Sequence, residues 1–124
     1  MADEDRSRRR ILVVEDDCAA GYALARMLQI LGYETKCVET VAAAVPALHG
    51  HDAVILDLNL PDGLGTEVMS SIRTNRLPHK VLVVSATADP RLLEEVARLQ
   101  PDGVLRKPVC IEQIKAWLDV HLED

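Results

Sequence analysis

The side chains best suited to chemistry in this sequence stand where short apolar runs end. Four such runs end in acidic residues 15–17, Asp57, Ser85 and Lys107. Carboxylates that converge without equal positive charge repel one another, and a hard divalent cation with oxygen ligands, such as Mg²⁺, relieves that repulsion. A carboxylate beside Mg²⁺, with an amine and a hydroxyl opposite, is equipped for phosphoryl transfer.

In that chemistry each residue has one role. Asp57 attacks the phosphorus, Lys107 and the metal neutralise the charge on the phosphoryl oxygens, and Ser85 donates a hydrogen bond to one of them. The alternative interpretation is that each polar residue only ends its strand, and for any one residue alone that would suffice. Four such residues at one sheet edge favour a common site.

The elements that must position these residues alternate along the chain. Short apolar runs predict strands, and apolar residues at a helical period between them predict helices. The predicted strands are residues 11–14, 34–38, 53–56, 81–84 and 103–105. Continuous apolar strands separated by helices predict a parallel sheet that helices cover on both faces, so the chain is expected to be an α/β domain of five (βα) units.

Capping residues locate the predicted helices. Gly32 closes the first helix, and Thr40 is an N-cap for the second, which contains Pro46 and must therefore be short, kinked or late to start. Residues 59–63 are expected to form a loop before the third helix. Asp89-Pro90 pairs an N-cap with a first-turn proline for the fourth helix. A last helix follows, with one apolar stripe: Ile111, Ile114, Leu118 and Leu122.

Strand order decides whether the polar residues meet. In an open α/β sheet, ligands bind outside the carboxyl ends of the strands, near the point where the strand order reverses. With the order 2-1-3-4-5, the first and third strands are neighbours at that point. Asp16 and Asp57 would then face each other, and Ser85 and Lys107 would close the other side.

Together these segments resemble response-regulator receiver domains, the CheY-like superfamily of two-component signal transduction. The resemblance runs from Ile11 to Leu122, and four motifs carry it in order: residues 11–17 (ILVVEDD), 54–63 (VILDLNLPDG), 81–86 (VLVVSA) and Lys107-Pro108. It implies a three-layer, doubly wound (βα)5 flavodoxin-like fold. It also implies a phosphoprotein that takes its phosphoryl group from a histidine kinase or a phosphotransfer protein and then switches a partner surface.

The resemblance implies a role for each acidic residue. Asp57 is the phospho-acceptor and a ligand of Mg²⁺. Asp16 binds the metal directly, Glu15 binds it through water, and the backbone carbonyl of Asn59 supplies a further ligand. Asp17 is expected to start the helix instead of binding the metal.

The resemblance also assigns the residues opposite the acidic pair. Ser85 takes the place of the switch hydroxyl, Lys107 contacts the phosphate, and the Lys107-Pro108 bond is expected to be cis. One departure concerns the fifth strand, where many relatives carry an aromatic residue and this chain has Val104. Pro46 is a second departure, in the second helix and away from the site.

Length, charge and cysteine content indicate the location, the domain organisation and the kinds of partner. The chain has 124 residues, a net charge of −6 and three cysteines without a zinc or redox spacing. These features indicate a single reduced, cytoplasmic domain without direct nucleic-acid or membrane binding. We expect a flexible arm over residues 1–10, whose arginines are a solvated terminus more readily than an anionic partner site, and a receiver domain over residues 11–124, either alone or at the start of a longer protein. The expected partners are a kinase or phosphotransfer protein and a downstream effector.

Two other functions compete with this interpretation. A Mg²⁺-dependent aspartyl-phosphate hydrolase of the haloacid-dehalogenase type also uses an Asp after a strand, but it needs a second Asp two residues later, where this chain has Asn59. An unphosphorylated pseudo-receiver would lack the acidic pair, the acceptor Asp or the Lys, and none is missing. We therefore expect a phospho-acceptor that assists its own phosphorylation and dephosphorylation, not an enzyme with a separate substrate.

Three weaker signals remain. Residues 63–68 fit a loose G-x-G-x-x-V pattern, which is expected to be a turn and helix start because it does not follow the first strand. His49-Gly-His51 is either a metal site or, as we favour, a solvated loop. Trp117, the sole tryptophan, belongs either to the core or to a partner surface.

Overall fold

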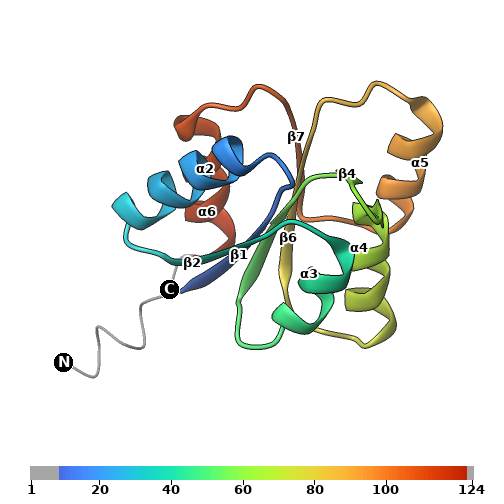
Figure 1. Cartoon of the computed structure of the whole chain (residues 1–124), viewed down its shortest axis with the longest axis horizontal. Helices are drawn as coiled ribbons and strands as arrows, with labels where there is room; N and C mark the ends of the chain where they lie inside the picture. The colour runs from blue at the N-terminus through green and yellow to red at the C-terminus, as the bar shows by residue number, and fades with distance from the viewer. Residues whose placement is uncertain (1–8, 123–124) are drawn as a thin grey trace.

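The computed structural model describes residues 9–122 as one twisted sheet between two layers of helices (Figure 1). Its five parallel strands are β1 (Arg10–Val14), β2 (Glu34–Val38), β3 (Ala53–Leu56), β6 (Lys80–Ser85) and β7 (Gly103–Arg106). Their order across the sheet is β2-β1-β3-β6-β7. This is the predicted order 2-1-3-4-5, so the doubly wound α/β fold is confirmed.

Within residues 9–122 four helices connect the strands of the sheet, α2 (Cys18–Ile30), α3 (Val41–Ala47), α4 (Gly65–Thr74) and α5 (Pro90–Arg98), and α6 (Ile111–His121) follows the last strand. Helices α2 and α6 cover one face of the sheet, and α3, α4 and α5 cover the other (Figure 1). No helix within residues 9–122 has the length and apolar character needed to span a membrane.

The sheet separates two apolar cores because successive strand side chains point to opposite faces. In β1, Leu12 and Val14 pack toward α3, α4 and α5, whereas Ile11 and Val13 pack toward α2 and α6. Residues 11–14 and 53–56 are all at most 2 % exposed. Strands buried on both faces hold their carboxyl ends rigidly, and those ends carry the polar residues.

The helix boundaries follow the predicted caps. Asp17 accepts a hydrogen bond from Ala20 N, Thr40 caps α3 through Ala43 N, and Asp89 precedes Pro90 at the start of α5. Gly32 follows α2 with φ of 102°, a conformation that glycine adopts readily. Pro46 lies inside α3, which has only seven residues, so of the short, kinked or late-starting helix that was expected the structure shows the short one.

The structure corrects the expected loop over residues 59–63. Two short strands, β4 (Asn59–Leu60) and β5 (Gly63–Leu64), pair there as an antiparallel hairpin. The two-residue turn Pro61-Asp62 supplies residues that favour tight turns. Strands β1, β6 and β7 also extend one residue or more beyond their predicted bounds.

The expected arm over residues 1–10 is only partly described. Residues 1–8, which include Arg6 and Arg8, lie outside the described part of the chain. Arg9 precedes the sheet, and Arg10 is the first residue of β1, where its Nε lies 3.1 Å from Glu34 Oε1. An exposed ion pair of this kind adds little stability.

Gly65 generates a first prediction. A β-carbon at this position would overlap the backbone oxygen of Asp57 and lie about 3.1 Å from Leu56 and Leu58. Because these neighbours are buried strand-end residues, Gly65→Ala should lower the free energy of unfolding by about 1–3 kcal/mol, measured by urea denaturation. Ser70→Ala, an exposed change on the same helix, should alter it by less than about 0.5 kcal/mol. Equal changes in the free energy of unfolding for the two variants would show that the end of β3 accommodates the added methyl group without strain.

Candidate functional site

The carboxyl ends of β1 and β3 bring three carboxylates together. Glu15 and Asp16 follow β1, and Asp57 follows its neighbour β3. One ligand oxygen from each lies within 4.8 Å of the others. Glu15 is 7 % and Asp57 9 % exposed, whereas Asp16 faces solvent. The structure thus confirms that these acidic residues converge.

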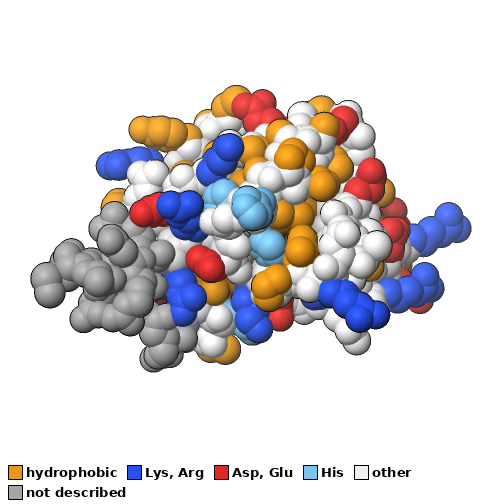
Figure 2. All heavy atoms as spheres, turned by 90° about the horizontal axis from the view of Figure 1, so that it is seen from below, with side chains coloured by type: hydrophobic (Ala, Val, Ile, Leu, Met, Phe, Trp, Pro, Cys, Tyr) orange, Lys and Arg blue, Asp and Glu red, His pale blue; other side chains and the backbone are white. Residues whose placement is uncertain are grey.

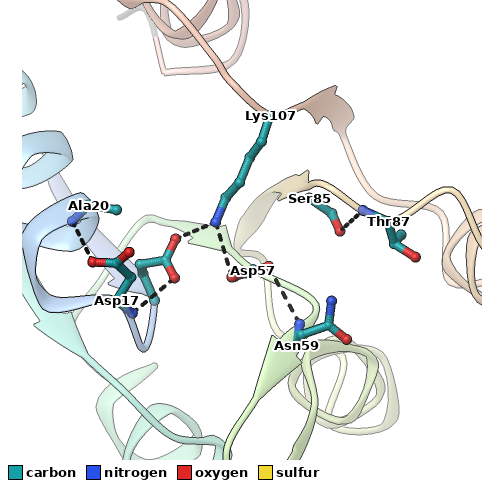
Figure 3. A network of polar contacts seen from close by, with 8 residues as sticks. Asp17, Ala20, Asp57, Asn59, Ser85, Thr87 and Lys107 are labelled. Atoms are coloured by element: carbon teal, nitrogen blue, oxygen red, sulfur yellow. Dashed lines mark hydrogen bonds and ion pairs between the residues drawn. The ribbon is translucent and has the colours of Figure 1, made fainter.

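Lys107, directly after β7, reaches across to two of these carboxylates (Figure 3). Its Nζ lies 2.6 Å from Glu15 Oε1 and 3.2 Å from Asp57 Oδ2. Burial alone would lower the pKa of Lys107, but the hydrogen bonds to Glu15 and Asp57 outweigh burial and raise the pKa above its usual value. The ammonium therefore stays protonated at neutral pH and partly neutralises the cluster.

The formal charges leave room for a divalent cation. Three carboxylates and one ammonium, −3 and +1, leave −2 at this end of the sheet. All the carboxylate donors are oxygens, and the exposed Asp16 gives access to a hydrated ion. This donor set suits Mg²⁺, which keeps several waters and binds few protein carboxylates.

Asp17 stands apart from the cluster. Its carboxylate accepts the hydrogen bond from Ala20 N at 3.1 Å, and its own N–H donates to Glu15 Oε2 at 3.2 Å (Figure 3). Asp17 is thus a helix cap that also orients Glu15. The prediction that it starts the helix is confirmed.

The β4–β5 hairpin is tied to the site at one end and to α3 at the other. Asn59 N lies 3.5 Å from Asp57 Oδ1 (Figure 3). Asp62 accepts hydrogen bonds from Val41 N at 2.8 Å and Ala42 N at 3.0 Å. These backbone hydrogen bonds lower the pKa of Asp62. Sequence reasoning missed this contact, because Asp62 has the spacing of an ordinary turn residue and its helix partner lies twenty residues earlier.

Ser85 ends β6 and is only 3 % exposed. Its hydroxyl accepts a hydrogen bond from Thr87 N at 3.1 Å (Figure 3). Within residues 9–122 no hydrogen bond joins Ser85 to Asp57. The hydroxyl proton is therefore still available to a group bound to Asp57.

The residues after the site take their expected conformations. The Lys107-Pro108 peptide bond is cis, as the resemblance implied. Val104 is 49 % exposed on β7, at the edge of the sheet. A half-exposed valine leaves no buried aromatic ring to turn inward at this position.

The weaker sequence signals have structural explanations. Gly63 lies in β5 and Gly65 begins α4, so the G-x-G-x-x-V pattern is a hairpin and helix start. His51 Nδ1 lies 2.6 Å from Ala47 O, and among residues 9–122 only the acidic cluster brings three metal-ligating groups together. Trp117 is 9 % exposed and donates to Asp102 O at 3.1 Å, which makes it a core residue.

Comparison with known proteins gives the same family. Residues 11–119 match the response regulator receiver domain family. The chain is 35 % identical over 111 residues to the transcriptional regulatory protein BasR of Escherichia coli, covering 86 % of this chain and 49 % of BasR. It is 34 % identical over 120 residues to the photosynthetic apparatus regulatory protein RegA of Rhodobacter capsulatus, covering 92 % of this chain and 65 % of RegA. The chain therefore spans about half to two thirds of these two relatives.

A solved structure agrees in fold. The signal receiver domain of a putative LuxO repressor protein from Vibrio parahaemolyticus superposes with a TM-score of 0.86 at 27 % identity, covering 94 % of this chain and 91 % of that one. The sheet order, the converging carboxylates and Lys107 are thus found together with a family match over most of the chain. The chain belongs to the response regulator receiver domain family of two-component signalling proteins.

Proposed function

We propose that Asp57 is the residue that receives the phosphoryl group in this receiver domain. The observation that carries the proposal is the position of its carboxylate, which lies within 4.8 Å of Glu15 and Asp16 and 3.2 Å from Lys107 Nζ. A nucleophile needs an oxygen that can reach a substrate and cations that balance the incoming charge. Asp57 is the carboxylate at the centre of this arrangement.

The metal expected at the site is Mg²⁺. Asp16 and Asp57 would bind it directly, Glu15 through water, and the Asn59 carbonyl would supply another oxygen, since the hairpin begins next to Asp57. When bound, Mg²⁺ neutralises charge on the phosphoryl oxygens. The net −2 charge of the cluster and its all-oxygen donor set support this assignment.

The transfer step conserves atoms and charge. An oxygen of Asp57 forms a bond to phosphorus as the bond from phosphorus to the donor's histidine nitrogen breaks, and the imidazole leaves with its electron pair. Lys107 moves its hydrogen bond from the Asp57 carboxylate to an oxygen of the bound phosphoryl group. Hydrolysis by water later returns Asp57 to its free form. The domain therefore assists its own phosphorylation and dephosphorylation.

The signal leaves through the segment after Ser85. The phosphoryl oxygens can accept the hydroxyl proton of Ser85, whose oxygen now holds Thr87 N. That pull should shift residues 86–89 and the start of α5 at Pro90. Since Val104 carries no ring, small movements of α5, β7 and α6 would carry the switch.

The setting follows from this function. The donor would be a sensor histidine kinase or a histidine phosphotransfer protein, and the receiver, over residues 11–124, would present its switched surface to an effector. BasR and RegA are named as regulatory proteins and extend beyond the matched region. A cytoplasmic location and no direct contact with nucleic acid or membrane fit the net charge of −6 and the absence of a spanning helix within residues 9–122.

The acceptor can be tested by mass. Incubation with Mg²⁺ and acetyl phosphate should add one phosphoryl group, because Asp57 is the carboxylate beside both Lys107 and the acidic pair. Asp57→Asn should abolish the added mass. Asp62→Asn is the control and should retain it, because Asp62 lies in the turn of the β4–β5 hairpin and accepts hydrogen bonds from α3. Labelling of Asp57→Asn at the wild-type level would refute the assignment.

The metal ligands can be separated within the acidic run. Asp16→Asn should weaken Mg²⁺ binding roughly tenfold or more, because it removes a charged ligand. Asp17→Asn is the matched control, since asparagine also caps helices and Asp17 is outside the cluster. Amide chemical shifts during a Mg²⁺ titration measure both affinities. Equal losses in the two variants would place the metal elsewhere in the run.

Lys107 should act on the phosphoryl group and not on the metal. Lys107→Ala removes a cation that contacts Glu15 and Asp57. Mg²⁺ affinity should therefore be unchanged or rise a few-fold, because the repulsion between Mg²⁺ and one partly exposed positive charge is lost. Phosphorylation by acetyl phosphate should slow, and the shifts of residues 86–89 on phosphorylation should shrink. Lys115→Ala, which breaks only the exposed pair with Asp119, should alter none of these. Loss of Mg²⁺ binding in Lys107→Ala would contradict this role.

A further inference from the structure

A second polar region lies at the opposite end of the sheet, where the central strands begin. A hollow of about 210 Å³ opens there. Its lining includes five basic side chains and one carboxylate: Arg9, His51, His79, Lys80 and His121, with Asp52. Figure 2 shows the histidine side chains gathered near the middle of this face, with lysine and arginine side chains around them.

The balance of charge is unusual for this chain. Its net charge is −6, and it has only four histidines, three of which line this one hollow. The carboxylate of Asp52 is already engaged, because its Oδ2 accepts a hydrogen bond from Arg10 N at 2.9 Å. A basic hollow in an acidic protein attracts small anions.

His79 is the second, independent observation. Its side chain is buried, with 8 % exposure, and its Nε2 lies 2.6 Å from Leu48 O. Because a carbonyl only accepts, Nε2 must carry the hydrogen, and in the neutral ring Nδ1 then has a lone pair. The Nδ1 atom is buried without a hydrogen-bond partner. Such an atom costs free energy unless a ligand or a water reaches it, and His79 is one of the residues that line the hollow.

Two further histidines of the lining contact other parts of the fold, His51 through a hydrogen bond and His121 through a ring contact. His51 Nδ1 lies 2.6 Å from Ala47 O, which leaves Nε2 as the nitrogen that a ligand can use. The ring of His121 lies against that of Trp117, with centroids 4.7 Å apart. His51 follows the carboxyl end of α3, and His121 is the last residue of α6.

We propose that this hollow binds a small oxyanion of the phosphate class. Lys80 and Arg9 supply permanent positive charge, and the hydroxyl of a hydrogen phosphate ion is a donor that His79 Nδ1 can accept. A metal ion fits less well: within residues 9–122 the histidine nitrogens and Asp52 do not converge within 4.8 Å as the acidic cluster does, and two cations line the hollow.

The test uses the full chain, inorganic phosphate and no Mg²⁺, so that the acidic site stays without its metal. Histidine ring NMR should show saturable shifts for His51, His79 and His121 but not for His49, which is outside the lining. Sulfate, which carries no proton at neutral pH, should bind more weakly than phosphate, because it has no donor for His79 Nδ1. Trp117 fluorescence provides a second readout beside His121.

Substitutions test how each charged residue of the lining changes the affinity for phosphate. Lys80→Gln should weaken phosphate binding several-fold, and Asp52→Asn should strengthen it while keeping an acceptor for Arg10 N. Lys36→Gln, on the distant edge strand β2, is the matched control and should change nothing. His79→Gln should weaken phosphate binding several-fold, and if that variant fails to fold, His51→Gln takes its place.

Three results would overturn the proposal. Equal shifts of all four histidines with phosphate and with chloride at the same ionic strength would show charge screening alone. Shifts caused by Zn²⁺ but not by phosphate would make the hollow a metal site. If neither phosphate nor Zn²⁺ caused a saturable shift, the hollow would bind neither ion and would hold only water. Labelling of Asp57 by acetyl phosphate in Lys80→Gln should stay at the wild-type level, so this test is independent of the proposed acceptor.

Discussion

The ion pairs of Lys107 with Glu15 and Asp57 are the interaction on which the functional end of the molecule depends. They join residues 92 and 50 positions apart in the chain, and the two carboxylate side chains are only about a tenth exposed. Without the ammonium, or a metal in its vicinity, three converging carboxylates would repel one another. Removing one partner of a buried ion pair is costly because the other charge is left uncompensated. The site is therefore stable only when cations balance it, and a phosphoryl group changes that balance directly.

The fold holds the three carboxylates close together on rigid strand ends and places less buried segments beside them. Strands β1 and β3 are buried on both faces, so Asp57 and the acidic pair begin from fixed backbone positions. The segment that follows β6 is not buried, and within it Thr87 N donates to Ser85 Oγ and Asp89 N to Thr87 Oγ1. Charge added at Asp57 can therefore move the segment after β6 without disturbing the strands. This arrangement suits a two-state switch better than a site whose whole surroundings are buried.

The sequence was informative where a single residue type determines the local structure. Alternation of apolar runs and helical periods predicted five strands in a parallel sheet, the resemblance to receiver domains supplied their order, and Thr40, Asp89 and Gly32 located helix ends. The β4–β5 hairpin was missed, because two-residue strands have no periodicity to detect. The contact of Asp62 with α3 and the hollow around His79 were missed for another reason. Both depend on residues that are distant in sequence and ordinary in type, and only the packing of helices on the sheet brings them together.

The same strands end in opposite electrostatic environments. At their carboxyl ends, carboxylates outnumber the ammonium of Lys107, and at their amino ends five basic side chains face one carboxylate. Strand β3 has only four residues, so Asp52 and Asp57 lie on either side of it, about 16 Å of extended chain apart at roughly 3.3 Å per residue. Over that distance salt screens most interaction through solvent, while buried strands transmit it better. An anion at the amino ends and a phosphoryl group at Asp57 would thus occupy two ends of one rigid unit. Any influence between them must pass through β3 and its neighbours, because the apolar layers on both faces exclude ions and water.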